Sequence, residues 1–509
     1  MYSNKENVNI LTSLLVAHGV THAVVCPGSR NAPIVHNFNE CPDMECYPIT
    51  DERSAGFYAL GMTQALGQPV AVCVTSGSAL LNLAPAVAEA YYQHRPLVVI
   101  SADRPQQWID QLDGQTLPQP DALGRFVRKA VSLPEPCNDE QRWYCNRMVN
   151  EALLEKHAPV HINVPISEPL FEFTEETLPV ERLIERRDAV LSNITLSHVC
   201  RMFMQAKRPM LIAGQPMNPH LDEAVYLVKD DDEYVPDFIL YTGGSIVSKR
   251  VKHFLRKAKE TWAVNETGEV NDTFMNLTQV IQGDSEVVAD QIRFFLEQQP
   301  HPFVQKWAQL LKRVQQHAED YAPAFSQMAA VKYFERHASN PIVHYANSSA
   351  IRLANIYARH AVYCNRGVNG IEGSLSTAAG FSCVADERVF CVTGDLSFFY
   401  DQNALWNQNL RGNFRILLLN NGKGGIFNML HGLEQSPARD RLIAAQHTTT
   451  AEGICRQNQV AYRQAGDMDQ MQKGIDWLLQ TESEHPLLLE VLTDAEEDER
   501  VFKEYYHTL

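Results

Sequence analysis

The sequence has few of the patterns that indicate a membrane protein, a secreted protein or a zinc protein. Its 11 cysteines are scattered and form no C-x-x-C pair, which argues against a zinc site and a compact disulfide framework. No apolar run approaches the roughly 20 residues that span a bilayer. The polar residues 1–9 do not resemble a signal peptide. We therefore expect a protein of the reducing cytoplasm without membrane insertion.

Positive charge is also scarce. The 509 residues include 44 Lys and Arg against 61 Asp and Glu, which gives a net charge of −17. This balance argues against nucleic acid as the main partner, although a few local Arg and Lys residues can still bind a small anion. The motifs G-x-x-x-x-G-K-[ST] and G-x-G-x-x-G are absent as well, which disfavours a P-loop and a dinucleotide site.

What the sequence does contain is an alternation of short apolar strands and helices. Ala23–Cys26, Val70–Val74 and Leu97–Ser101 are predicted strands in the first third, and the pattern resumes from about residue 341 with Val389–Thr393 and Arg415–Leu419. Short apolar strands between helices indicate parallel sheets that are covered by helices on both faces. The ends of such strands are where these sheets bind ligands.

We predict an α/β protein of three domains with doubly wound, mostly parallel sheets. The predicted domains are residues 1–180, 188–320 and 330–509, and a polar linker precedes the second. The central domain is apparently shortened, because little chain separates residue 213 from Asp222 where another strand–helix unit is expected.

Two of the predicted strand ends carry a candidate metal site. Gly394-Asp395-Leu396-Ser397 follows one strand, and Asn421 ends the next strand 26 residues later. A carboxylate, an amide oxygen and a backbone carbonyl of Lys423 are suitable ligands for Mg²⁺. The neighbouring glycines let the backbone approach a diphosphate closely.

This Gly-Asp and Asn-Asn pattern resembles the cofactor motif of thiamine-diphosphate enzymes. The resemblance implies thiamine diphosphate with Mg²⁺ or Mn²⁺ as cofactors, a pyrimidine-binding first domain and a diphosphate-binding last domain. It also implies a catalytic Glu that protonates the pyrimidine ring, and Glu52 in Asp51-Glu-Arg-Ser-Ala-Gly56 occupies the matching place. The cofactor is the electron sink in such enzymes, while the protein supplies geometry and proton relay.

Within that family, the sequence is similar to the 2-succinyl-5-enolpyruvyl-6-hydroxy-3-cyclohexene-1-carboxylate synthases of menaquinone (vitamin K2) biosynthesis. The similar segments include Cys26–Pro33, Asp51–Gly56, Ala102–Pro105, Val247–Arg250 and Asn420–Phe427. The resemblance implies a transferase that decarboxylates 2-oxoglutarate and adds the remaining carbon unit to isochorismate. Both substrates are dicarboxylates, which Arg side chains bind well.

The resemblance assigns roles to further residues by matched motif. The implied metal ligands are Asp395, Asn421 and, through its carbonyl, Lys423, whose side chain we therefore expect to be replaceable. The implied cofactor-binding residues are Thr75, Ser76, Gly77, Ile371, Gly394, Asp395, Leu396, Ser397, Asn421, Gly425 and Ile426. The implied substrate-binding residues are Ser29, Arg30, Arg104, Gln115, Lys249, Arg250, Ser348, Arg352 and Arg366.

Some features leave alternatives open. Gly114 stands where the family often has an Asn beside Gln115, and Lys249 and Arg250 could instead belong to a basic helix face. A related thiamine-dependent 2-oxo acid decarboxylase or acetohydroxyacid-type synthase, or an inactive cofactor-binding homologue, is a competing function. The family builds each site from two subunits, which implies a homodimer or a homotetramer.

Overall fold

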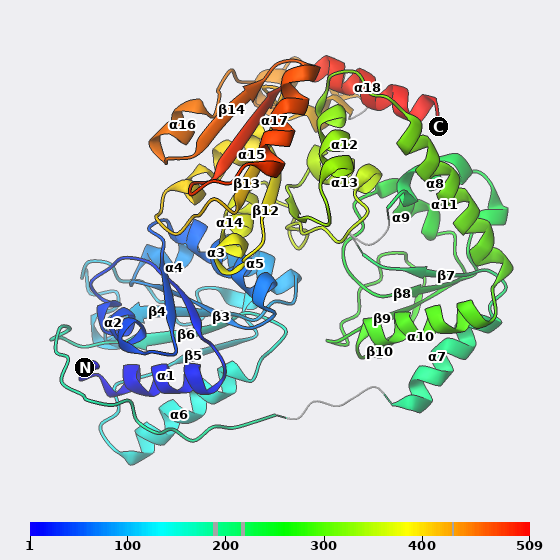
Figure 1. The fold of residues 1–509 in the computed structure, drawn as a ribbon. Helices are drawn as coiled ribbons and strands as arrows, with labels where there is room; N and C mark the ends of the chain where they lie inside the picture. Colours follow the sequence, from blue (N-terminus) through cyan, green and yellow to red (C-terminus); the bar gives the residue numbers. More distant parts are fainter. Residues whose placement is uncertain (187–191, 215–218, 430–431) are drawn as a thin grey trace.

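The computed structural model describes residues 1–186, 192–214, 219–429 and 432–509. It contains three parallel sheets, each in its own lobe (Figure 1). The N-terminal lobe (residues 1–186) and the central lobe (192–214 and 219–320) flank the C-terminal lobe (321–429 and 432–509), so that the three form an arch. This architecture confirms the predicted α/β class with mostly parallel sheets, while the exact domain boundaries stay a prediction.

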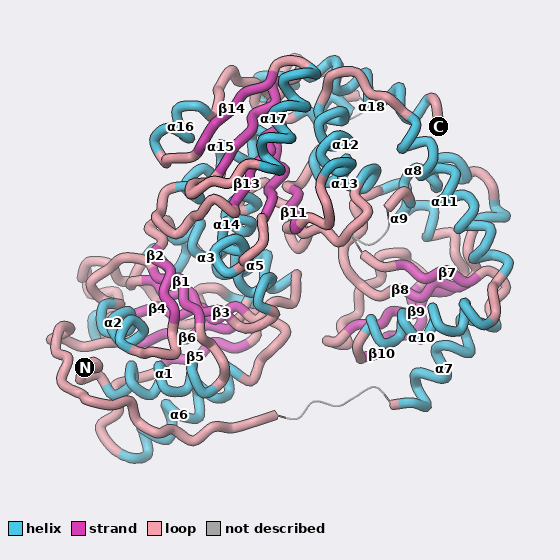
Figure 2. The backbone as a smooth tube through the Cα atoms, in the orientation of Figure 1, coloured by secondary structure: helices cyan, strands magenta, loops and turns pink. Residues whose placement is uncertain are grey.

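The N-terminal lobe is a six-stranded sheet in the order β2-β1-β3-β4-β6-β5. Strands β3 and β4 are buried along their whole length, as expected where helices cover both faces. Helices α1 and α6 lie on one face, and α3 and α5 lie on the face toward the C-terminal lobe (Figure 2). The elements are β1 His22–Val25, β2 Glu45–Pro48, β3 Val70–Val74, β4 Leu97–Asp103, β5 Lys129–Ser132, β6 Val160–Pro165, α1 Glu6–Ala17, α2 Ala32–Glu40, α3 Glu52–Leu66, α4 Ser78–Asn82, α5 Ala84–Tyr92 and α6 Asp139–Leu153.

The central lobe has the smallest sheet, with four described strands in the order β10-β9-β8-β7. The expected strands at Met210–Ala213 and Phe238–Tyr241 are present as β7 and β8, whereas β9 and β10 were not predicted. Its elements are β7 Pro209–Ile212, β8 Phe238–Tyr241, β9 Glu260–Asn265, β10 Leu277–Gln282, α7 Asn193–Gln205, α8 Leu221–Val228, α9 Lys249–Leu255, α10 Ser285–Gln298 and α11 Pro302–Asp320.

The C-terminal lobe is a five-stranded sheet in the order β11-β12-β13-β15-β14. All seven residues of β13 are buried, so this strand forms the centre of the lobe. The elements are β11 Ile342–Tyr345, β12 Val389–Gly394, β13 Phe414–Asn420, β14 Ala461–Ala465, β15 Leu487–Leu492, α12 Gln327–His337, α13 Ser349–Tyr357, α14 Ser374–Val384, α15 Asp395–Tyr400, α16 Glu452–Gln457, α17 Met468–Gln480 and α18 Ala495–His507.

Helices α3 and α14 join the N-terminal and C-terminal lobes through glycines. A Cβ on Gly61 would lie 1.9 Å from the carbonyl oxygen of Thr377, and one on Gly380 would lie 2.2 Å from that of Tyr58. Only glycine permits backbones to approach this closely. The contact places the start of α3, where Glu52 lies, against the C-terminal lobe.

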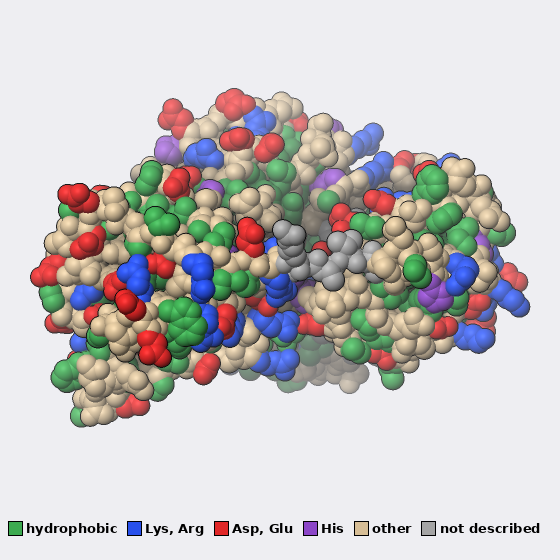
Figure 3. Space-filling model, turned by 90° about the horizontal axis from the view of Figure 1, so that it is seen from below, with side chains coloured by type: hydrophobic (Ala, Val, Ile, Leu, Met, Phe, Trp, Pro, Cys, Tyr) green, Lys and Arg blue, Asp and Glu red, His purple; other side chains and the backbone are tan. Residues whose placement is uncertain are grey.

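Charges of both signs are mixed on the surface that Figure 3 shows. Seen from below (Figure 3), acidic and basic side chains are interspersed, and the molecule is hollowed between the N-terminal and central lobes.

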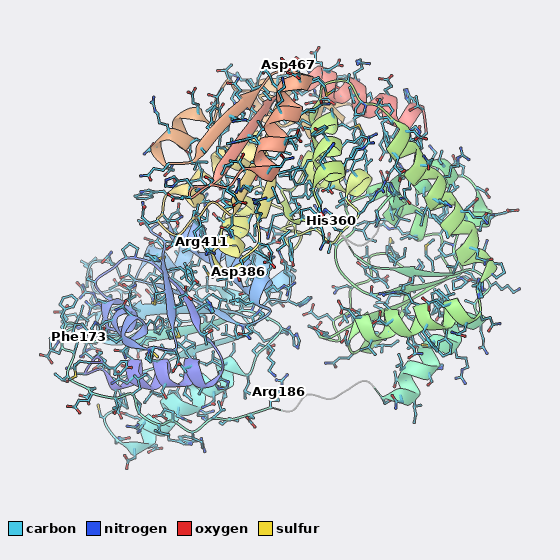
Figure 4. The ribbon with its side chains drawn as sticks, in the orientation of Figure 1. Phe173, Arg186, His360, Asp386, Arg411 and Asp467 are labelled. Carbon is cyan, nitrogen blue, oxygen red and sulfur yellow. The ribbon has the colours of Figure 1, made fainter. Side chains whose placement is uncertain are left out.

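His360, labelled in Figure 4, lies where the C-terminal lobe faces the central one, and its Nε2 is 2.9 Å from the buried Glu335 carboxylate. Within the part of the chain that the structure describes, every helix is too short or too polar to cross a membrane.

Candidate active site

The predicted metal ligands meet at the carboxyl end of the C-terminal sheet. Gly394 ends β12 beside Leu419 of β13, so Asp395 and Asn421 follow neighbouring strands. The Asp395 carboxylate is 4% exposed and accepts hydrogen bonds from the amides of Leu396 (2.7 Å) and Gly422 (2.9 Å). Because β12 and β13 are parallel neighbours, the side chains that follow them lie at the same edge of the sheet.

Asp395 has little positive charge around it. Its one ionisable partner within 4 Å among the described residues is His447, whose Nε2 lies 3.4 Å from Oδ2. Burial raises the pKa of Asp395, although its backbone hydrogen bonds and His447 act in the opposite direction. A buried carboxylate without a Lys or Arg partner fits a site for a cation.

Asn421 presents an oxygen at the same place. Its amide nitrogen donates to Oδ2 of the half-buried Asp498 at 3.0 Å, which leaves the amide oxygen as the atom of this side chain that can accept from or coordinate a ligand. A Cβ on Gly425 would lie 2.9 Å from that nitrogen, while one on Gly394 would meet nothing within 4 Å. The strand end thus has open space beside an anionic and a neutral oxygen, the donors that a divalent cation with a diphosphate requires.

The Lys423 side chain has a role that the sequence did not indicate. It is only 9% exposed, and its Nζ lies 3.3 Å from Oδ1 of Asp440. A buried ammonium with a carboxylate partner contributes to the local fold. The expectation that this side chain is replaceable stays a prediction, and the ion pair with Asp440 is the contact that a substitution would remove.

A cavity of about 210 Å³ lies beside this strand end. The Ser397 hydroxyl donates to the carbonyl of Ile371 at 2.6 Å, which ties the cavity wall to α15. The cavity brings together five of the predicted residues, Ser348, Arg352, Arg366, Ile371 and Ile426. The remaining lining residues are Val247, Asn347, Ile351 and Asn369.

Arg352 and Arg366 bring two positive charges to the lining of this cavity. Among the described residues, neither buried Nε atom has a hydrogen-bond partner, and Arg366 Nη1 donates to the neutral Asn347 amide oxygen at 3.0 Å. Burial lowers the pKa of Arg366, and Arg352 adds to the effect. Ser348, the N-cap residue that precedes α13, has φ +75°, a strained backbone for a non-glycine residue. Such unpaired cations and local strain are typical of a binding site for an anion.

Glu52 lies at the other end of the expected site, in the first turn of α3. Asp51 caps the helix by accepting from the Ser54 amide at 3.2 Å, and Oε2 of the half-exposed Glu52 accepts from the Asn82 amide at 3.1 Å. The C-terminal lobe holds this turn in place, because Asn403 donates to Asp51 at 2.7 Å.

The Thr75-Ser76-Gly77 turn follows β3, and Thr75 Oγ1 is buried without a hydrogen-bond partner. Gly77 has φ +87° and donates its amide to Oε1 of the fully buried Gln119 at 2.7 Å. The Gln119 amide nitrogen in turn donates to the Ala102 carbonyl at 3.0 Å. Sequence reasoning missed Gln119, which has no motif of its own.

Arg30 and Arg104 line a second cavity, of about 580 Å³. Arg30 is 6% exposed and lies 3.1 Å from Glu168, and Arg104 lies 2.8 Å from Asp113. Ser29, which precedes Arg30, and Gln115, which follows Asp113 by two residues, are both exposed. The Gln115 backbone packs against Gly77. Arg30 and Arg104 follow strands β1 and β4, at the same edge of the sheet as Thr75. Both Arg side chains already form ion pairs with carboxylates of the N-terminal lobe.

The two predicted substrate-binding residues of α9, Lys249 and Arg250, have different surroundings. Lys249 is exposed at the start of the helix, whereas Arg250 lies 3.2 Å from Asp222 and stacks on Tyr226 and Tyr506. The structure therefore does not bring Arg250 to the cavity of Arg352 and Arg366. Sequence reasoning passed over Lys252 of the same helix, whose pKa is lowered by burial and further by the positive charge of Arg366.

The two groups of residues stay apart within one chain. The 210 Å³ cavity is lined by the central and C-terminal lobes, and the 580 Å³ cavity by the N-terminal lobe alone. Glu52 and Asp395 line neither. One chain thus carries, among its described residues, two separate groups of candidate residues, an N-terminal and a C-terminal candidate half-site.

Comparison with known proteins gives the family. Residues 6–123 match the family described as "Thiamine pyrophosphate enzyme, N-terminal TPP binding domain". Proteins named 2-succinyl-5-enolpyruvyl-6-hydroxy-3-cyclohexene-1-carboxylate synthase are similar over the whole chain. They include those of Bacteroides fragilis (43% identical, 100% of both chains), Bacteroides thetaiotaomicron (42%, 100% of both) and Flavobacterium johnsoniae (34%, 97% of both).

The alignment also bears on chain length. It spans 558 positions for the Bacteroides fragilis protein against 509 residues here, a difference of 49. That exceeds the roughly 30 residues of a βαβ unit, which agrees with a shortened chain. With this identity over its full length, the chain belongs to the 2-succinyl-5-enolpyruvyl-6-hydroxy-3-cyclohexene-1-carboxylate synthase family of thiamine-diphosphate enzymes.

Proposed function

We propose that the chain catalyses decarboxylation of 2-oxoglutarate and addition of the resulting four-carbon unit to isochorismate, giving 2-succinyl-5-enolpyruvyl-6-hydroxy-3-cyclohexene-1-carboxylate and CO₂. Family membership supports the reaction. The observation that carries the substrate class is the cavity in which Arg352 and Arg366 lie beside Ile371 and Ile426, with no carboxylate among the described residues that line it. Dianionic substrates supply the missing negative charge.

Asp395, Asn421 and the Lys423 carbonyl would hold Mg²⁺ or Mn²⁺, and the glycines around them would accommodate the diphosphate. Thiamine diphosphate, when bound, supplies the carbanion centre and electron sink for the decarboxylation. Glu52 would hold the proton that activates the cofactor's pyrimidine ring, and Asn82 orients its carboxylate. Thr75 Oγ1 is free to bind a ligand at the same half-site.

The separation of the half-sites supports a homodimer as the smallest active unit. Glu52 and the Thr75 turn of one subunit would face Asp395 and Asn421 of another, and a homotetramer is built by pairing two such dimers. All 11 cysteines are free thiols, in keeping with the reducing cytoplasm.

The test is a spectrophotometric assay with thiamine diphosphate, Mg²⁺, 2-oxoglutarate and isochorismate. We expect isochorismate consumption that depends on 2-oxoglutarate and on both cofactors. Turnover of a 2-oxo acid without isochorismate would instead indicate a related decarboxylase. Cofactor binding without any turnover would favour an inactive homologue.

A further inference from the structure

His447 lies beside the proposed metal site, although no motif of the sequence singled it out. Its Nε2 lies 3.4 Å from Oδ2 of Asp395, which is longer than an N–H···O hydrogen bond. Among the described residues, this buried nitrogen has no hydrogen-bond partner. The side chain is only 17% exposed, and its ring packs edge-to-face on Phe399 of α15 at a centroid distance of 5.4 Å. A buried ring nitrogen without a partner is uncommon in folded proteins and calls for a functional explanation.

The other ring nitrogen of His447 fixes where the imidazole proton lies. The Thr449 amide donates to Nδ1 at 3.1 Å, and a ring nitrogen that accepts a hydrogen bond carries no proton. The proton of the neutral ring therefore lies on Nε2, the nitrogen beside Asp395. A ring nitrogen must lose its proton to bind a metal ion. His447 therefore acts on this site as a hydrogen-bond donor and not as a metal ligand.

The segment that carries His447 is hydrogen-bonded to the glycine turn after β13. The His447 amide donates to the Gly422 carbonyl, and the Gly424 amide donates to the Ala444 carbonyl, both at 2.7 Å. The Gly422 amide in turn donates to Oδ2 of Asp395 at 2.9 Å. One residue of the turn thus binds both His447 and Asp395, which fixes the distance between them.

A buried carboxylate of β15 also holds this segment. Glu490 is fully buried and accepts from the Asn420 amide nitrogen at 2.7 Å and from the Ala451 amide at 3.1 Å. Asn420 also donates to the Thr449 carbonyl at 2.9 Å. The first Asn of the Asn-Asn motif therefore ties the segment to the strand end, while the second Asn is the proposed metal ligand. Buried networks whose members are paired hold their parts rigidly.

We infer that His447 is a positioning residue of the proposed metal site, in which its Nε2–H donates to Oδ2 of Asp395 and holds the carboxylate toward the cation. A shift of a few tenths of an ångström brings the two atoms to hydrogen-bond distance. Carboxylates that bind metals are themselves held by such donors, which fix their orientation. A cation keeps the carboxylate ionised, so the hydrogen bond is charge-assisted. His447 has this role only if the proposed function, which supplies the cation and the cofactor, is correct.

Two substitutions separate the two ring nitrogens of His447. His447→Asn still accepts from the Thr449 amide, because Asn side chains bind the backbone two residues on, but it lacks a donor at the position of Nε2. His447→Gln places an N–H donor near that position but lacks the acceptor at Nδ1. The first variant keeps the contact within the segment and removes the donor, and the second does the reverse.

The experiment titrates Mn²⁺ into the full-length protein with saturating thiamine diphosphate and measures free Mn²⁺ by electron paramagnetic resonance. We expect His447→Asn to weaken Mn²⁺ binding about 10- to 100-fold, as for other partners of metal ligands, without a fall in the Tm of the cofactor-free protein. His447→Gln should keep the affinity within about three-fold of the wild type, since the donor is retained.

His485→Ala is the matched control, because His485 is an exposed histidine of the same lobe and its loss should not change Mn²⁺ affinity. Unchanged affinity in His447→Asn would overturn the inference. A loss confined to His447→Gln would do the same, because the role would then lie in the Thr449 contact. Equal losses in both variants would also overturn it, since they would show a general disturbance of the segment.

Mn²⁺ binding also separates the role of His447 from the proposed reaction. A wild type that binds Mn²⁺ with thiamine diphosphate but consumes no isochorismate would overturn the proposed function and leave His447 in the metal site. Normal turnover with equal Mn²⁺ affinity in the wild type and His447→Asn would leave the reaction and remove His447 from the site. A wild type that binds no Mn²⁺ would overturn both.

Discussion

The two half-sites hold their cations in opposite ways. In the N-terminal half-site, Arg30 and Arg104 each lie within 3.1 Å of a carboxylate, Glu168 or Asp113. In the C-terminal half-site, Arg352 and Arg366 have buried Nε atoms without partners. Under the proposed function, the first pair would exchange one anion for another when substrate binds, whereas the second pair would receive an anion that no described residue supplies. Substitutions in the two half-sites should therefore differ in their effects on stability and binding.

The largest effect is expected from Glu52→Gln in the N-terminal half-site, where kcat should fall but the affinity for thiamine diphosphate should not. Glu52→Gln should reduce kcat by about 10²- to 10⁴-fold, because it removes the acid that activates the cofactor. Its affinity for thiamine diphosphate should stay near that of the wild type, since Gln keeps the shape and the contact with Asn82. Stopped-flow turnover and calorimetric cofactor titration measure the two quantities. Full activity would remove Glu52 from the mechanism.

In the C-terminal half-site, a substitution should weaken cofactor binding rather than slow the chemical step alone. Asp395→Ala should weaken Mg²⁺-dependent cofactor binding by at least about 100-fold, since it deletes the one anionic ligand of the proposed metal site. Its stability without cofactor should change little, because the removal of a buried carboxylate with few cations offsets the loss of its hydrogen bonds from the Leu396 and Gly422 amides. Asp386→Ala, an exposed change in the same lobe (Figure 4), is the control. Unchanged cofactor affinity in Asp395→Ala would contradict the metal assignment.

Arg366→Gln tests the unpaired cations directly. A charge-assisted hydrogen bond is worth about 1.5–3 kcal/mol, so KM for a dicarboxylate should rise roughly 10- to 150-fold. The Tm should hold, because Arg366 has no acidic hydrogen-bond partner among the described residues to leave unpaired. Arg359→Gln alters an exposed Arg that pairs with Glu319 and should leave KM unchanged. A large fall in Tm with constant KM would mean that Arg366 is structural.

The smallest effect is expected from the paired cations. Glu168→Gln frees Arg30 and reduces the competing negative charge near Arg104, which lies 3.9 Å from the same carboxylate. Glu168 is 69% exposed, so the gain is that of a surface pair, about 0.2–1 kcal/mol, or at most about a five-fold lower KM. Steady-state kinetics at low ionic strength reveal it best. A higher KM would show that Glu168 positions Arg30 rather than competing for it.

Much of the fold and the candidate site follows from local sequence. The continuous apolar runs of β3 and β13 predict buried parallel strands, and the motifs after them fall at strand ends because parallel strands share a direction. The weakly patterned β9 and β10 escaped prediction, since exposed Thr278 and Gln279 interrupt the apolar pattern of β10. The neighbouring positions of Asp395 and Asn421 could be predicted because both follow parallel strands. The position of Gln119 could not, because no motif surrounds it.

The amino-acid sequence by itself determined the α/β class, the strand-end motifs and the family, because these depend on periodicity and on short segments. Only the tertiary structure decided which charges are free. Arg250 is paired with Asp222, 28 residues before it, although its helix follows Val247, which lines the cavity of Arg352 and Arg366. Lys423 likewise turned out to be buried against Asp440. Ion pairs and burial depend on how lobes pack, and a helix's sequence does not state which of its faces meets a neighbour.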